Sequence, residues 1–135
     1  MRILLDTNVI ISAAMFPKSL IGEVIAHITK NHKLVICQFT LNELSNVFEK
    51  KLPERKKYLD EFIGKLKYEL INMDITDFKK YPKIRDSNDM PILANAIEAK
   101  VDLLVTGDKD FDEIVIKNPI IMKPAKYIQE YMQLK

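Results

Sequence analysis

Four acidic residues lie at or near the start of a predicted helix or helical turn: Asp6, Glu43, Asp89 and Asp108. Each has an ordinary structural interpretation, because acidic side chains cap helices and offset the positive end of the helix dipole. For Asp6 the local sequence supports capping and catalysis equally. For Glu43 the structural interpretation is favoured, because Thr40 and Glu43 form a capping-box pattern at the start of a predicted helix.

Taken together, the four acids point to metal chemistry. Carboxylates that share a pocket repel one another, so some of their pKa values rise unless a cation neutralises them. Oxygen ligands without histidine or cysteine select Mg²⁺ or Mn²⁺ rather than zinc. Such an ion would polarise a phosphoryl oxygen and activate water for in-line attack. Asp86 is expected to serve the same helix start as Asp89, and Asp110 and Asp112 are expected to be solvated.

Other chemistries fit the sequence less well. The chain has only three glycines, so it holds neither a Walker loop nor a dinucleotide-binding fingerprint. His27 and His32 are remote in sequence from the acidic region and are expected to be surface residues. An aspartyl-phosphate enzyme would need a second aspartate two residues after Asp6, where this chain has Asn8.

The elements that must position the acids are short strands alternating with helices. Strands are predicted at residues 2–5, 34–37, 71–75, 102–105 and 120–122. Helices are predicted at residues 9–15, 20–29, from 40 onward, 53–70, 88–100 and 125–132, with a helical turn at 109–114. Continuous aliphatic strands that alternate with helices indicate a parallel sheet covered on both faces. In such sheets, sites form at the carboxyl ends of the strands, near the point where strand order reverses.

Size and composition are those of an ordinary soluble protein. The 135 residues suit one domain, residues 1–135, and 47% of them are hydrophobic. The single cysteine, Cys37, excludes an intrachain disulfide and is expected to be a buried thiol. No apolar stretch approaches the ~20 residues that span a bilayer. Because Asp6 also interrupts the first apolar run, we expect no signal peptide, no membrane association and a cytoplasmic location.

The net charge is only +2, but the charges are unevenly distributed. Basic residues gather at 50–57 and 79–85, and most of the aspartates lie between residues 86 and 112. An acidic centre flanked by basic segments suits a metal site that receives a polyanion. Taken alone, each basic run is better read as a solvated helix face or loop.

Four stretches of the chain, in order and spacing, resemble the PIN domain family. They are residues 3–11 (ILLDTNVII), 40–44 (TLNEL), 85–96 (RDSNDMPILANA) and 102–111 (DLLVTGDKDF). The first alone would be weak, but the ordered set is specific and covers the whole chain. The resemblance implies an α/β fold: a three-layer α/β/α sandwich with a central parallel sheet, related to the flap-endonuclease core. It also implies a ribonuclease that depends on Mg²⁺ or Mn²⁺.

The resemblance assigns roles by position. The positions that match the family's catalytic, metal-binding acids are Asp6, Glu43, Asp89 and Asp108. The positions that match supporting polar residues are Asn8, Asp86 and Thr106. Of these, Asp86 is the weakest match, because the family places its extra acid variably.

Two functions from different classes follow. The first is a metal-dependent endoribonuclease acting on single-stranded RNA, the toxin of a toxin–antitoxin pair, with a small antitoxin protein as inhibitor and a homodimer as assembly. The alternative is a catalytically silent PIN-fold module that binds RNA or protein. The enzyme is favoured because all four acids are present, whereas degenerate modules lose one or more. Cleavage of structured DNA is disfavoured, because no appended region for engaging a duplex is found.

Overall fold

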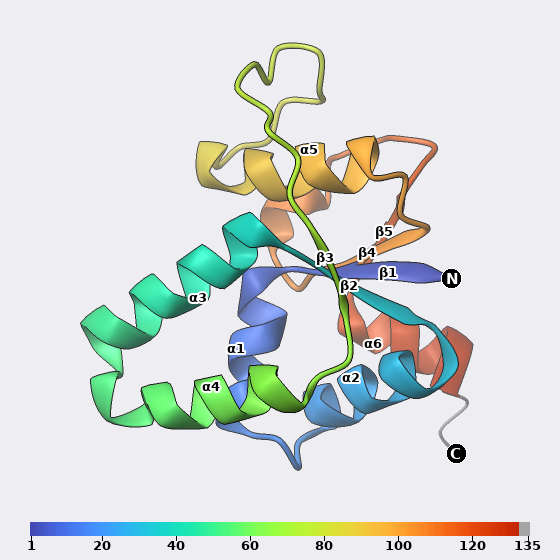
Figure 1. The fold of residues 1–135 in the computed structure, drawn as a ribbon. Helices are drawn as coiled ribbons and strands as arrows, with labels where there is room; N and C mark the ends of the chain where they lie inside the picture. The colour runs from blue at the N-terminus through green and yellow to red at the C-terminus, as the bar shows by residue number, and fades with distance from the viewer. Residues whose placement is uncertain (133–135) are drawn as a thin grey trace.

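The computed structural model describes residues 1–132, in which five strands alternate with helices (Figure 1). The strands are β1 (Arg2–Leu5), β2 (Lys33–Cys37), β3 (Glu69–Ile71), β4 (Leu103–Val105) and β5 (Ile120–Met122). The helices are α1 (Thr7–Met15), α2 (Leu20–Asn31), α3 (Gln38–Lys51), α4 (Lys56–Lys65), α5 (Met90–Glu98) and α6 (Pro124–Tyr127). Short 3₁₀ helices are η1 (Pro53–Arg55), η2 (Ser87–Asp89) and η3 (Lys109–Phe111), and α6 continues into a π-helical turn, η4 (Ile128–Met132).

The five strands form one parallel sheet in the order β3-β2-β1-β4-β5. Helix α5 lies on one face, and α1, α2, α4 and α6 lie on the other (Figure 1). Successive strand residues point to opposite faces, so Ile3 and Leu5 join the core with α1, α2 and α4, whereas Leu4 packs with α5. The predicted three-layer α/β/α sandwich is therefore confirmed.

The strand order reverses beside β1, which places the predicted site. After β1 the chain moves outward to β2 and β3, and it then returns to the other side of β1 as β4. The register aligns Leu5 of β1 with Val105 of β4. Both strands end there, so the residues that follow them, Asp6 and Thr106, emerge side by side at the carboxyl edge.

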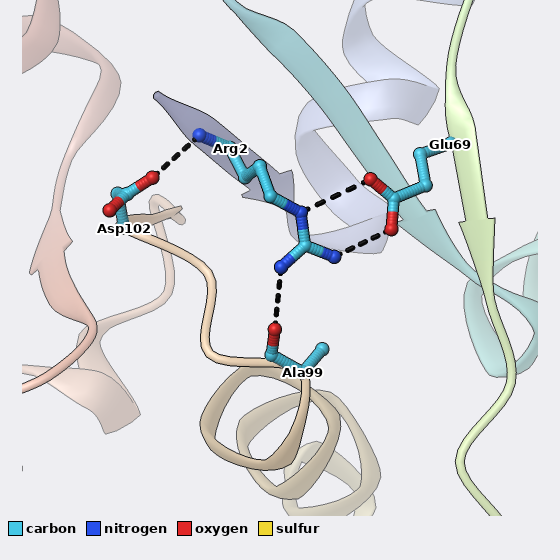
Figure 2. A network of polar contacts seen from close by, with 4 residues as sticks. All are labelled: Arg2, Glu69, Ala99 and Asp102. Atoms are coloured by element: carbon cyan, nitrogen blue, oxygen red, sulfur yellow. Dashed lines mark hydrogen bonds and ion pairs between the residues drawn. The ribbon is translucent and has the colours of Figure 1, made fainter.

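The amino edge of the sheet is held by Arg2 (Figure 2). Its guanidinium donates to both carboxylate oxygens of Glu69 in β3, at 3.1 and 2.6 Å, and to the carbonyl of Ala99 after α5, at 2.6 Å. Its backbone N–H donates to Asp102 at 2.7 Å. The hydrogen bond from Arg2 is also the main cause that lowers the pKa of Glu69. This clamp joins β1, β3 and the segment before β4 at the edge opposite the acids.

The structure corrects three predicted elements. The helix predicted from 53 to 70 ends at Lys65, because Leu66 is already extended. Leu70, the last residue of the predicted helix, is instead an exposed residue of β3. That strand ends at Ile71, so the predicted strand at 71–75 is wrong beyond its first residue. The final helix turns from α-helical to π-helical geometry at Ile128.

Several residues outside the acidic region behave as core or packing groups. Cys37 is buried, as predicted, and burial raises the pKa of its thiol. His27 and His32 are half-buried rather than exposed, and His27 Nδ1 lies 2.7 Å from the hydroxyl of Tyr127 in α6. In residues 1–132 no single helix is long and apolar enough to cross a membrane. Helices α1 and α2 taken together pass the same test, with a bend of 111° between them.

Candidate active site

Asp6 is a buried carboxylate at the point where strand order reverses. It directly follows β1 and is 3% exposed. One oxygen accepts from the backbone N–H of Thr7 at 2.7 Å, and the other accepts from the Thr106 hydroxyl at 2.7 Å. The first bond caps α1, so the structural interpretation of Asp6 is correct. The second ties Asp6 to the residue after β4, at the carboxyl edge where a reactive group is expected.

Burial raises the pKa of Asp6 above its ordinary value. The hydrogen bonds from Thr106 and Thr7 act in the opposite direction, and the nearby charge of Asp108 raises the pKa further. A buried carboxylate beside another carboxylate is costly to ionise. The metal-free site therefore carries electrostatic strain that a cation would relieve.

Glu43 does not complete a capping box, contrary to the local reading of the sequence. Helix α3 begins at Gln38, and its N-cap, Cys37, makes no side-chain capping bond. Thr40 is buried inside the first turn, with its hydroxyl 3.2 Å from the Cys37 sulfur. The Glu43 carboxylate instead accepts from the Thr7 hydroxyl at 2.7 Å. Glu43 is thus directed to the start of α1, next to Asp6.

Asp89 has the most perturbed carboxylate of the site. It lies at the N-cap position of α5 but makes no side-chain capping bond. Its Oδ2 atom is buried and has no hydrogen-bond partner among residues 1–132. Burial raises the pKa of Asp89 to about 7, and the charges of Asp108 and then Asp6 act in the same direction. An unpartnered carboxylate oxygen among like charges is the position that a bound cation would fill.

Asp108 follows β4 and Thr106 and completes the group around Asp89. Its backbone N–H donates to the Thr106 hydroxyl at 3.1 Å, and its carboxylate accepts from the backbone N–H of Asp110 at 2.9 Å. Thr106 therefore contacts both Asp6 and the backbone of Asp108. The hydroxyl fixes the relative placement of the two acids.

Sequence reasoning missed Asp110. Predicted to be solvated, it is half-buried, and its carboxylate lies with those of Asp86 and Asp89: one oxygen from each falls within 4.8 Å of the others. Only Asp89 of this trio belongs to the four acids predicted to bind metal. Asp86 caps η2 by accepting from Asn88 at 3.0 Å. Nothing local marks Asp110, because an acid in the first turn of a short helix has a sufficient structural reason to be there.

The predicted residues thus gather at one edge in two linked parts. The charges of Asp6, Asp108 and Asp86 all raise the pKa of Asp89, and Glu43 joins Asp6 through Thr7. Asn8 is exposed on the first turn of α1. The donors are carboxylate oxygens, a set that suits Mg²⁺ or Mn²⁺. The orphaned Asp89 oxygen shows that the residues present fit such an ion.

Comparisons with known proteins bear on the family and the fold of the chain. The sequence model of the PIN domain matches residues 2–110. No curated protein matches the chain. Among solved structures, the chain is similar to one described as VapBC2 from Rickettsia felis bound to a DNA fragment from their promoter. The identity is 24% and the TM-score 0.71, over 91% of this chain and 98% of the other. At that identity the likeness concerns the fold.

Proposed function

The chain belongs to the PIN domain family, and we propose that it is a metal-dependent endoribonuclease that hydrolyses phosphodiester bonds of single-stranded RNA. The observation that carries this proposal is the buried, unpartnered Oδ2 of Asp89, whose pKa is raised to about 7 beside Asp108 and Asp6. Like-charged carboxylates are held together at such cost where a divalent cation completes the site.

The residues we assign as catalytic and metal-binding are Asp6, Glu43, Asp89 and Asp108. Asp86 and Asp110 extend the ligand set, because their carboxylates lie beside that of Asp89. Thr106 holds Asp6, and Thr7 holds Glu43, each through a 2.7 Å hydrogen bond. Asn8, exposed on the first turn of α1, is assigned a supporting role. A bound Mg²⁺ or Mn²⁺ would polarise the scissile phosphate and supply an activated water.

Charge around the site supports a polyanionic substrate. Arg85 and Lys109 are exposed and adjoin Asp86 and Asp108 in sequence. Neither makes an ion pair within the described part of the chain. Their charges are thus free to contact phosphates. They also attract the phosphates of RNA to an edge of the sheet whose carboxylates would otherwise repel them.

A protein partner is also proposed. The resemblance of the sequence implies the toxin of a toxin–antitoxin pair, and the similar solved structure is of a complex, VapBC2. A hollow of about 650 Å³ lies between α1, α3 and α4, and its lining is both apolar, with Met15, Tyr58 and Phe62, and charged, with Glu54, Arg55, Glu61 and Lys65. A hollow that combines apolar and charged side chains suits an amphipathic partner helix. We further propose that residues 1–135 act as one cytoplasmic nuclease domain, assembled as a homodimer.

The proposal is tested by incubating the purified protein with a labelled pool of random-sequence single-stranded RNA, in Mg²⁺, in Mn²⁺ and in EDTA. We expect cleavage with either metal and none in EDTA. A pool avoids dependence on a chosen target. If neither metal supports cleavage at any protein concentration, the chain is the silent module instead.

Glu43→Gln is expected to weaken Mn²⁺ binding by at least about tenfold, because the amide keeps the shape of the side chain but loses the charge. Thr7→Val should weaken binding by a similar factor, because Glu43 then loses the hydroxyl that positions it. Calorimetric titration with Mn²⁺ measures both effects. Glu49→Gln, an exposed position on the same helix, is the matched control and should leave the affinity unchanged. Equal affinities in all four proteins would remove Glu43 from the ligand set.

A further inference from the structure

A second concave feature lies beside the acids. It is a hollow of about 380 Å³ at the carboxyl ends of β2 and β3, between the first turns of α3 and α5. The residues that line it, which we call the aromatic hollow, include Phe39, Met73, Ile75, Phe78, Pro91 and Asn95. Its size lies at the lower end of the range for small-ligand pockets.

The aromatic hollow adjoins the candidate active site on two elements. Phe39 precedes Glu43 by four residues on α3, a spacing that places both side chains on one side of the helix. Pro91 follows Asp89 by two residues at the start of α5. A chain held in the hollow would therefore continue directly to the acids.

The lining suits a flat, uncharged group. Phe39 and Phe78 are half-buried, and each packs against the core on the α5 face. Asn95 is buried and joins two backbone segments that line the hollow. It accepts from the Met73 N–H at 3.2 Å and donates to the Pro91 carbonyl at 2.8 Å. Of the lining residues only Asp74 is charged, and it is exposed. Half-buried rings in a rigid frame are the usual stacking platform for an unpaired base.

The segment that joins the hollow to the acids is basic. It runs from Phe78 to Asp86 and carries Lys79, Lys83 and Arg85, all exposed. None of the three makes an ion pair with another residue in 1–132. Cations between a stacking surface and an acidic centre are placed to contact the phosphates on either side of a bound nucleoside.

We propose that the aromatic hollow binds one unpaired nucleobase of the RNA substrate, stacked against Phe39 and Phe78, next to the phosphate presented to the acids. This inference rests on the proposed function and adds to it the contact that would select single-stranded over duplex RNA. A paired base is not available to enter the hollow, so duplex RNA would lose this contact.

The test compares removal of the ring with removal of the base. Binding of a fluorescein-labelled single-stranded RNA octamer is measured by anisotropy with Mn²⁺, in an Asp6→Asn background that leaves the RNA intact. An abasic site is moved through each position in turn. We expect one position at which base loss weakens binding by about 5- to 150-fold, the range for loss of one base–aromatic stack. In Phe78→Leu or Phe39→Leu, an abasic site at that position should no longer weaken binding. In Phe78→Tyr, which keeps an aromatic ring, it should weaken binding as before.

Leucine fills most of the phenyl volume, so both variants should fold, which their thermal melting verifies. Tyr58→Leu removes an exposed ring on α4 and should leave the abasic profile unchanged. An identical profile in Phe78→Leu, Phe39→Leu and the background protein would overturn the base-binding inference while leaving the nuclease intact. Failure of the octamer to bind would overturn it as well. Absence of cleavage by the wild-type chain, in contrast, contradicts the proposed function itself.

Discussion

Asp6→Asn is expected to abolish metal-dependent RNA cleavage, with a loss of at least about 100-fold. The substitution keeps the shape of the side chain and both of its neighbours. The asparagine oxygen still accepts from the Thr7 N–H, and the amide faces the Thr106 hydroxyl, which can accept. What disappears is one negative charge at the centre of the site. The measurement is the rate of cleavage of labelled RNA in Mn²⁺.

Misfolding would also abolish activity, but it would lower the free energy of unfolding, which loss of the Asp6 charge alone should not do. Burial raises the pKa of Asp6, so removing its charge should leave the metal-free protein equally or more stable at neutral pH. Asp60→Asn, on the exposed side of α4, is the matched control and should change neither property. Full activity in Asp6→Asn would eliminate the assigned site.

Asp89→Asn is expected to stabilise the metal-free protein at pH 8 by about 1–2 kcal/mol. This is less than the pKa shift alone implies, because the half-buried side chain is partly screened by solvent. The pKa of Asp89 is about 7 in the folded chain, against an ordinary value of 3.8. Urea unfolding in EDTA at a series of pH values gives the free energy of unfolding of both proteins.

The sign of the pH dependence follows from proton binding. Between about pH 4 and pH 7 the folded state holds the Asp89 proton and the unfolded state does not. The Asp89 contribution to stability is therefore complete below the unfolded pKa and is lost as the pH rises through about 7. Asp89→Asn cannot lose stability in this way. The difference in free energy of unfolding between the two proteins should therefore be small near pH 4, grow as the pH rises, and level off above pH 7.

Divalent metal should stabilise the wild type relative to Asp89→Asn, the opposite of the difference expected in EDTA. Because the ion binds the ionised carboxylate, added Mn²⁺ should stabilise the wild type more at pH 8 than at pH 6, and should stabilise Asp89→Asn little at either. Parallel stability curves for wild type and variant in EDTA would show that Asp89 ionises freely. The proposed metal site would then lose its main support.

The parts of the fold that could be predicted are those with a strong local pattern. The continuous aliphatic run at residues 3–5 forms a strand, and Asp6 follows it, because the run has no polar interruption until that residue. The Thr40–Glu43 pattern misled because β2 passes into α3 without a connecting loop: Cys37 ends the strand and is also the N-cap. Thr40 therefore falls inside the helix, where no capping box can form.

Other differences arise from contacts between distant segments. Leu70 lies four residues after Leu66, which is helical spacing. The segment is nevertheless a strand, because Leu70 and its neighbours pair with β2. The bond between Thr7 and Glu43 joins residues 36 positions apart, and no local rule predicts it. The proximity of Asp110 to Asp86 likewise depends on how η3 lies against η2. The sequence thus predicts which acids lie at this edge of the sheet better than it predicts what each one touches.

The hydrogen bond from Thr106 to Asp6 closes a separation of 100 residues, and this has a consequence during synthesis. At roughly 5–20 residues per second, β1 is synthesised roughly 5–20 s before β4. Until then the central strand lacks one neighbour, and Asp6 lacks both Thr106 and Asp108. A nascent chain shorter than about 108 residues accordingly holds no complete acid group. Under the proposed nuclease function, the chain cannot act until its last acids have joined the first.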